Sequence, residues 1–344
     1  MSPFARAPPI GHHVAMNLMN SRRAAMAAAL LIGLGGFGAA ASAAYPERPV
    51  RIVVPFPAGG GTDVIARVLG EKLGASLGRP FVVENRPGAG AMIGADQVAK
   101  AVPDGHTVLL GTSAELTISP GLYKDVPYDP DADFTPVALL GVSPVILVAH
   151  PSFKANSLAD LIREAKQDPG AIAIGSGGQG AAPHLAAELL KRLTGIDVII
   201  VPYRGGGPAL ADVVAGQVGA TFSTIASVMP HLQSHSIKAL AVITAERSML
   251  LPDVPSAAEQ GIVDYEVVTW FGLFTPAKTS AEIVGVLRTA VDRALHDPDM
   301  TQRLIGLGIE PGSVEAGGDR LRQRIRTEVA RWRLVIRDAG IKPD

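Results

Sequence analysis

The sequence twice places a strand-like run before a glycine-rich loop and an amphipathic segment, and this pattern restricts the fold more than any other feature. In the first copy, residues 50–54 precede the loop 58–63 and apolar residues at helical spacing. In the second copy, residues 172–174 precede the loop 175–180 and a helix that Pro183 opens. Strands that alternate with helices are typical of a mostly parallel sheet covered by helices. Two copies therefore predict two similar α/β lobes.

Other segments extend this α/β prediction along the chain. The last expected helix has an apolar stripe beside a run of arginines, which is typical of a docked helix with a solvated basic face rather than of a membrane- or nucleic-acid-binding surface. We expect further strands at 81–83, 107–110, 198–201, 220–222, 239–243 and 267–274, and helices at 283–294, 300–307 and 321–336.

The length and composition exclude several classes of protein. A chain of 344 residues has room for about two core-bearing units. It carries 31 basic and 32 acidic residues, so it lacks the strong positive field that nucleic-acid binding usually requires. Because the chain contains 0 cysteines, disulfide frameworks, thiol catalysis and cysteine-ligated metals are excluded.

The N-terminal residues 1–43 have the layout of a secretory signal peptide. Arg22 and Arg23 precede an apolar run over 24–41, and the run ends in the small residues Ala41-Ser42-Ala43. The alternative is a membrane anchor, but this run is short, rich in alanine and glycine, and followed by a cleavage pattern. We therefore expect cleavage after about Ala43 and export of the mature protein to the periplasm.

Both glycine loops are suited to binding an anion, because a helix N-terminus presents free N–H groups and a partial positive charge. The first loop lacks the Gly-Lys-Ser/Thr ending of a nucleotide phosphate loop, and its Asp63 can also cap the helix. The second loop matches Gly-x-Gly-x-x-Gly at Gly175, Gly177 and Gly180, so an enzyme that binds NADP is the main alternative. No acidic ribose ligand follows the next strand, where Arg204 stands instead.

The remaining motifs do not indicate catalysis. A Gly-x-Ser-x-Gly pattern at 74–78 falls at the end of a predicted helix rather than after a strand. His231 and His235 are four residues apart but lack a neighbouring glutamate, so we interpret them as surface histidines. No nucleophile and base pair, paired carboxylates or metal cluster accompanies the loops. The residues therefore favour a protein that is not an enzyme and carries no cofactor.

Several segments in order along the mature chain resemble the Bug family, the periplasmic solute receptors of tripartite tricarboxylate transporters. They begin with Tyr-Pro-Glu-Arg-Pro-Val-Arg-Ile-Val-Val-Pro at 45–55 and end with Ala-Gly-Ile-Lys at 339–342. The others are the 58–60 glycine loop with Asp63, Glu-Asn-Arg-Pro-Gly-Ala-Gly at 84–90, Pro-Asp-Gly at 103–105, Pro-Tyr-Asp-Pro at 127–130, Val-Pro-Tyr-Arg-Gly at 201–205 and Leu-Pro-Asp-Val-Pro at 251–255.

This resemblance implies a type II periplasmic binding protein, in which two α/β lobes joined by crossing strands close on a ligand like a Venus flytrap. The implied division is 44–145 for lobe 1, 146–268 for lobe 2, and 269–344 for the return to lobe 1 with the C-terminal helices. In such receptors backbone amides and hydroxyls of both lobes hold a carboxylate. Carried over, the ligand-binding positions are Phe56, Ala58, Gly59, Gly60, Thr112 and Ser113 in lobe 1, and Gly177, Gln179, Gly180, Ala181, Ala182, His184, Tyr203 and Gly205 in lobe 2.

The resemblance also implies a function: a monomeric extracytoplasmic receptor that captures a small carboxylate of the organic acid or acidic amino acid class. Its partners are then the integral membrane subunits of a transporter, with no role for nucleic acid. One position departs from the family, which often has serine where this chain has Ala181. The loss of that serine hydroxyl implies a different ligand, or an added water that replaces the contact. His184 is placed either to contact the ligand or to cap its helix. A secreted interaction protein that binds no small anion is a third hypothesis.

Overall fold

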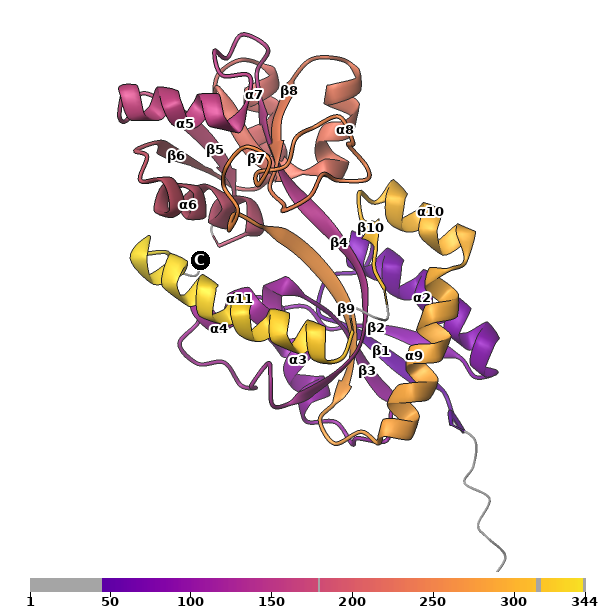
Figure 1. The fold of residues 1–344 in the computed structure, drawn as a ribbon. Helices are drawn as coiled ribbons and strands as arrows, with labels where there is room; N and C mark the ends of the chain where they lie inside the picture. Colours follow the sequence, from indigo (N-terminus) through magenta and orange to yellow (C-terminus); the bar gives the residue numbers. More distant parts are fainter. Residues whose placement is uncertain (1–44, 179, 314–316, 343–344) are drawn as a thin grey trace, which may run out of the picture. The chain divides into compact units, whose positions relative to one another are not determined.

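A computed structural model describes residues 45–178, 180–313 and 317–342 of the protein (Figure 1). The predicted signal peptide, 1–43, and the candidate residue Gln179 lie outside the described residues. Within the described part, no helix is both long and apolar enough to cross a membrane.

The strands form two parallel triplets with the same internal order. Both β2-β1-β3 and β6-β5-β7 are parallel, and in each triplet the strand that comes first in the chain lies in the middle. The prediction of two similar α/β lobes is therefore confirmed. The strands are β1 (Val50–Val54), β2 (Phe81–Asn85), β3 (Thr107–Thr112), β4 (Phe134–Ala149), β5 (Ala173–Gly177), β6 (Ile199–Tyr203), β7 (Ala220–Thr224), β8 (Lys238–Val242), β9 (Val268–Pro276) and β10 (Glu310–Pro311).

Two long strands connect the triplets. The first part of β4, Phe134 to Pro144, pairs antiparallel with β9, and β9 in turn pairs antiparallel with β3. From Val145 onward β4 pairs with β7 and β8 instead. Figure 1 shows β4 and β9 running together from one set of strands to the other. The expected crossing strands are thus present, while the lobe boundaries at 145/146 and 268/269 stay a prediction.

The helices begin and end where local chemistry favours it. The Ser157 and Ser280 hydroxyls accept hydrogen bonds from amides in the first turns of the helices that follow. Gly78 and Gly195 end their helices in the left-handed conformation that glycine adopts without strain. The helices are α2 (Gly61–Leu77), α3 (Met92–Ala99), the π-helix η1 (Ala114–Ile118), α4 (Ser119–Leu122), α5 (Leu158–Gln167), α6 (Ala182–Thr194), α7 (Gly206–Val214), α8 (Ile225–Gln233), α9 (Ala281–Leu295), α10 (Pro298–Gly306) and α11 (Asp319–Asp338).

Helix α11 packs into two hydrophobic cores. Its first half contributes Leu321 to a core that includes residues of β3 and β9. Its second half contributes Trp332 to a core built largely from α6 and the strands of the second triplet. Between them, Glu328 accepts hydrogen bonds from the Trp270 Nε1 atom at 2.8 Å and the Thr117 hydroxyl at 3.1 Å. The predicted docked helix is confirmed, and it contacts the cores of both triplets.

Two elements differ from the sequence-based expectation. The strand β4 was not predicted, because Pro136 and Pro144 interrupt its pattern, and the structure places register shifts after Pro136 and after Leu139. The strand β5 extends to Gly177, so Gly175 and Gly177 belong to a strand rather than to the expected loop. A Cβ atom on Gly177 would lie 2.5 Å from the Gly206 backbone, so close packing requires glycine there.

Candidate functional site

One pocket, of about 660 Å³, is lined by residues that follow the carboxyl ends of β1, β3 and β5. Ligands of parallel α/β sheets normally bind at this edge. Since β1 and β3 belong to one triplet and β5 to the other, both lobes contribute to the pocket. The lining residues are Pro55, Phe56, Pro57, Thr62, Pro87, Gly88, Gly90, Ala91, Thr112, Ser113, Ala114, Ile118, Ser119, Leu122, Tyr123, Gly180, Ala181, Ala182, Pro183, Thr269 and Phe271.

The loop that carries Phe56 is held by the buried carboxylate of Asp63. The Asp63 Oδ2 atom accepts hydrogen bonds from the Arg67 Nε atom and from the Gly59 amide, both at 2.9 Å. The Asn85 side chain donates to Asp63 Oδ1 at 3.0 Å and to the Phe56 carbonyl at 3.1 Å. The Arg67 hydrogen bond, with those of Gly59 and Asn85, lowers the pKa of Asp63 to about 2. The Gly59 amide therefore donates its hydrogen bond to Asp63 rather than to a ligand.

Thr112 is engaged in the same way by a second buried carboxylate. The Thr112 amide and hydroxyl donate to the two oxygens of Glu115, at 2.5 Å and 2.7 Å. The Thr112 hydroxyl also accepts a hydrogen bond from the Ala114 amide at 3.1 Å. Burial of Glu115 raises the pKa of its carboxyl to about 7. Thr112 thus lines the pocket, but its polar groups are already bonded to Glu115 and Ala114.

Ser113 provides the hydroxyl that Thr112 does not. It follows β3 directly, lines the pocket and is only 2% exposed. Its carbonyl accepts a hydrogen bond from the Thr117 hydroxyl at 2.7 Å, while its own hydroxyl forms no hydrogen bond with any described residue. Because Ser113 lines the pocket, its hydroxyl is available to a ligand or a water there. Ser113 is therefore the best-placed side-chain donor in this pocket.

The second source of donors is the N-terminus of α6. Residues 180–183 line the pocket, so the start of this helix faces it. The Gly180 amide donates to the His184 Nδ1 atom at 2.9 Å, which places His184 as a cap within its own helix turn. First-turn amides such as that of Ala182 have no acceptor inside the helix. They and the helix dipole favour a bound anion.

The rest of the pocket wall is mainly apolar. Phe56 and Phe271 lie on the wall with Ile118 and Leu122 of the η1–α4 segment. A Cβ atom on Gly180 would lie 2.9 Å from the Leu122 side chain, so the α6 loop packs closely on α4. None of the described lining residues is Asp, Glu, Lys, Arg or His. The pocket can therefore hold an anion only through backbone amides, hydroxyls and the helix dipole.

The structure brings only part of the predicted site together. The Tyr203 hydroxyl donates to Asp212 at 2.7 Å, and this bond and burial raise the pKa of the phenol. Gly205 caps α7, and residues 58–60 are exposed outside the pocket lining. The predicted residues that line the pocket are Phe56, Thr112, Ser113, Gly180, Ala181 and Ala182, and those that do not are Ala58, Gly59, Gly60, Gly177, His184, Tyr203 and Gly205.

Sequence reasoning missed the η1–α4 segment, the loop 87–91 and the β9 residues of the lining. The sequence could have indicated the loop 87–91 as part of the site, because this loop overlaps the Pro-Gly-Ala-Gly motif of the family resemblance. Ser119 donates to the Gly90 carbonyl at 2.9 Å and holds this loop against α4. Ile118 had no signal, since a single π-helical turn has no periodic pattern of its own.

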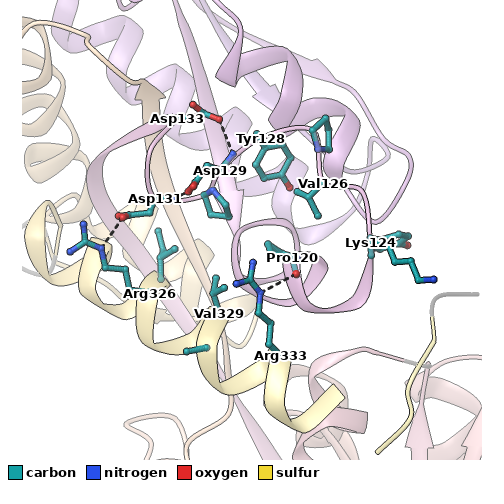
Figure 2. A pocket seen from close by; sticks show the side chains of 15 residues that line it. Pro120, Lys124, Val126, Tyr128, Asp129, Asp131, Asp133, Arg326, Val329 and Arg333 are labelled. Atoms are coloured by element: carbon teal, nitrogen blue, oxygen red, sulfur yellow. Dashed lines mark hydrogen bonds and ion pairs between the residues drawn. The ribbon is translucent and has the colours of Figure 1, made fainter. Parts of the chain in front are cut away.

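A second cavity, of about 750 Å³, lies between the segment 120–133 and α11 (Figure 2). Several of its charged side chains bond to neighbouring protein groups. The Arg326 Nε atom pairs with Asp131 at 2.8 Å, Asp133 accepts a hydrogen bond from the Asp129 amide at 2.7 Å, and Arg333 donates to the Pro120 carbonyl at 3.4 Å. Unlike the first pocket, this cavity is not lined by residues at the carboxyl ends of β1, β3 and β5, which favours the first pocket as the ligand site.

The structure also bears on the alternatives. The described residues contain no cluster of His, Asp and Glu side chains suited to a metal ion. Gly175 and Gly177 pair with Val201 and Tyr203 inside the sheet, whereas a dinucleotide fingerprint places these glycines in the turn after the strand. Arg204 is exposed and does not line the pocket. These placements weigh against NADP binding.

The chain is similar to known solute receptors. The sequence profile of the family described as "Tripartite tricarboxylate transporter family receptor" matches residues 65–341. Protein BugT of Bordetella pertussis is 38% identical over 94% of this chain and 99% of its own length. The solved structure of R. palustris Rpa4515 with adipate is 37% identical with a TM-score of 0.69, over 87% of this chain and 100% of that one. MatC of Rhodopseudomonas palustris with bound malate is 37% identical with a TM-score of 0.66, over 85% and 100%.

Proposed function

The chain belongs to the receptor family of tripartite tricarboxylate transporters, and we propose that it captures a small carboxylate and delivers it to membrane subunits of such a transporter. The family is one of solute receptors rather than enzymes. Its fold is the two-lobed type II periplasmic binding fold, and similar proteins were solved with adipate and with malate. We place the ligand in the pocket that both lobes line.

One observation carries this proposal. The Ser113 hydroxyl lies at the pocket wall and forms no hydrogen bond with any described residue, and the N-terminus of α6 faces the same pocket. Together they supply hydrogen-bond donors and about half a positive charge, which is what a carboxylate requires when no arginine or lysine is present. Ala181 offers no hydroxyl, so Ser113 takes the direct side-chain contact.

The proposed cellular location is the periplasm. The segment 1–43 would direct export and be removed after about Ala43, which leaves a mature monomer free to meet its membrane partners. The protein would act by binding alone, without cofactor or catalysis. Uptake of the bound acid by cells with and without this gene tests delivery, and equal uptake in both would contradict it.

Native mass spectrometry of the protein as purified, followed by calorimetric titration with a panel of carboxylates, tests capture. We expect one bound carboxylic acid molecule per protein chain. Ser113→Ala should weaken binding about tenfold or more, because a hydrogen bond to a charged group is lost. Ser234→Ala is the matched control, since that exposed serine bonds within its own turn and does not line the pocket. Binding of NADP and of no carboxylate would overturn the proposal.

A further inference from the structure

We infer that Glu328, a residue of α11 that does not line the pocket, positions Ser113 for ligand binding and does so through the Thr117 hydroxyl. The inference rests on the proposed function, because it concerns the affinity for a carboxylate. Glu328 is a positioning residue in this account, since it acts on the ligand only through Ser113.

The Glu328 carboxylate is fixed by three neighbouring side chains. Its side chain lies at the middle of α11, and the residue is only 4% exposed. The Oε2 atom accepts hydrogen bonds from the Trp270 Nε1 atom at 2.8 Å and from the Thr117 hydroxyl at 3.1 Å. The Oε1 atom accepts one from the Arg324 Nε atom at 2.8 Å, and a second nitrogen of Arg324 pairs with Glu266 at 2.6 Å. One cation and two neutral donors therefore hold this buried carboxylate in place.

Thr117 connects this carboxylate to the pocket wall. Its side chain is completely buried, and its hydroxyl lies 2.7 Å from the Ser113 carbonyl as well as 3.1 Å from Glu328. A hydroxyl has one proton, so the two acceptors share it in a three-centre hydrogen bond. The π-helix η1 begins directly after Ser113, and such a short turn has weak geometry of its own. The bond that Thr117 forms with Glu328 therefore helps to define where Ser113 lies.

Glu328 also holds the neighbouring part of the wall, which β9 supplies. Successive side chains of a strand point to opposite faces. Thr269 and Phe271 line the pocket, whereas Trp270 between them donates to Glu328 on the other face. One oxygen atom of α11 is thus bonded to η1 and to β9. The relative position of these two wall segments depends on that atom.

Docking of α11 by itself does not require a carboxylate. The helix already packs through apolar residues, with Leu321 in one core and Trp332 in another. Well-packed apolar residues often stabilise such a contact as well as a buried ion pair does, or better. What Glu328 adds is a defined position for two donors, Thr117 and Trp270. That property matters at a wall where a ligand must meet a hydroxyl.

The position of Ser113 should affect affinity. A donor that is held in place before binding loses little freedom when the ligand arrives. A donor that is displaced forms a longer and less well-aligned hydrogen bond, which is weaker. Loss of Glu328 should therefore remove part of what the Ser113 hydroxyl contributes, while the hydroxyl itself remains. We expect a loss of affinity of about threefold to tenfold.

Calorimetric titration of the purified protein and its variants provides a double-mutant cycle. The probes are adipate and malate, with which similar receptors were solved, and acetate as the smallest carboxylate. Glu328→Gln and Thr117→Val should each weaken binding of the tightest probe about threefold to tenfold, and their combination no more than the stronger of the two. In a Ser113→Ala background, neither change should weaken binding further by more than about twofold, because the hydroxyl that they position is gone.

Thr221→Val is the matched control for Thr117→Val. Thr221 is also completely buried, and its hydroxyl donates to the Gly175 carbonyl at 2.8 Å, but neither residue lines the pocket. Thr221→Val should lower the free energy of unfolding about as much as Thr117→Val does, and should leave affinity within about twofold of wild type. Urea unfolding and titration of both variants measure this difference.

Two results would overturn the inference and leave the proposed function standing. One is unchanged affinity in folded Glu328→Gln and Thr117→Val proteins, and the other is an equal loss of affinity with and without the Ser113 hydroxyl. Circular dichroism checks folding. If Glu328→Gln does not fold, Glu328→Asp takes its place with the same expected result, since it keeps the charge but withdraws the oxygens by one methylene. No binding of any of the three probes to the wild-type protein would instead overturn the proposed function, on which the inference rests.

Discussion

Glu115 combines complete burial with a structural role beside the pocket. Its side chain has no exposed surface, and its oxygens hold the amide and hydroxyl of Thr112. This arrangement leaves Ser113, the next residue, as the hydroxyl available to a ligand. At the scale of single residues, the Glu115 carboxyl group therefore determines which of two adjacent hydroxyls is available to bind the ligand.

The free energy of unfolding should depend on pH through this residue. Burial raises the pKa of Glu115 from 4.5 to about 7, so the neutral form stabilises the folded state and this contribution is lost as pH rises through 7. Between pH 5 and pH 8 the loss is roughly 2 to 3 kcal/mol. Glu115→Gln, which cannot ionise, should lack this part of the dependence. Urea unfolding at both pH values measures it, and parallel curves for the two proteins would show that Glu115 does not ionise in this range.

Helix α11 shows how one element stabilises two cores. Trp332 is 2% exposed and packs with α6 residues, while Leu334 on the same helix is 40% exposed. We expect Trp332→Ala to lower the free energy of unfolding by about 3 to 5 kcal/mol and Leu334→Ala by less than about 1 kcal/mol. Denaturant unfolding of both variants measures the difference. Similar losses in the two variants would mean that this half of the helix is not part of the core.

Sequence patterns predicted the elements whose own residues determine their structure. The β-branched run 50–54 forms β1, and the arginine-rich amphipathic segment 321–336 lies within α11. Patterns failed where tertiary packing decides. Gly177 belongs to β5 because it pairs with Tyr203 of β6, although glycine by itself favours loops, and the Gly206 backbone leaves no space there for a side chain. Ser113 was predicted as a candidate, but its difference from Thr112 depends on where the Glu115 side chain folds back, and spacing cannot show that.

At the scale of the whole molecule, the pocket exists only because both triplets supply part of it. The carboxyl ends of β1 and β3 bring Phe56 and Ser113, and the segment after β5 brings Ala181 and Ala182. The crossing strands β4 and β9 lie between the two triplets and join them in one sheet. Strand β9 also adds Phe271 to the pocket wall. A ligand bonded to both sides would favour the arrangement in which they are close.

A crystal structure of the protein with its bound carboxylate tests this site most directly. We predict one carboxylate within hydrogen-bond distance of the Ser113 hydroxyl and of first-turn amides of α6, with the rest of the ligand against Phe56, Leu122 and Phe271. The Arg204 side chain should make no contact with it. A carboxylate paired with Arg204, or bound between α11 and the segment 120–133, would contradict this site.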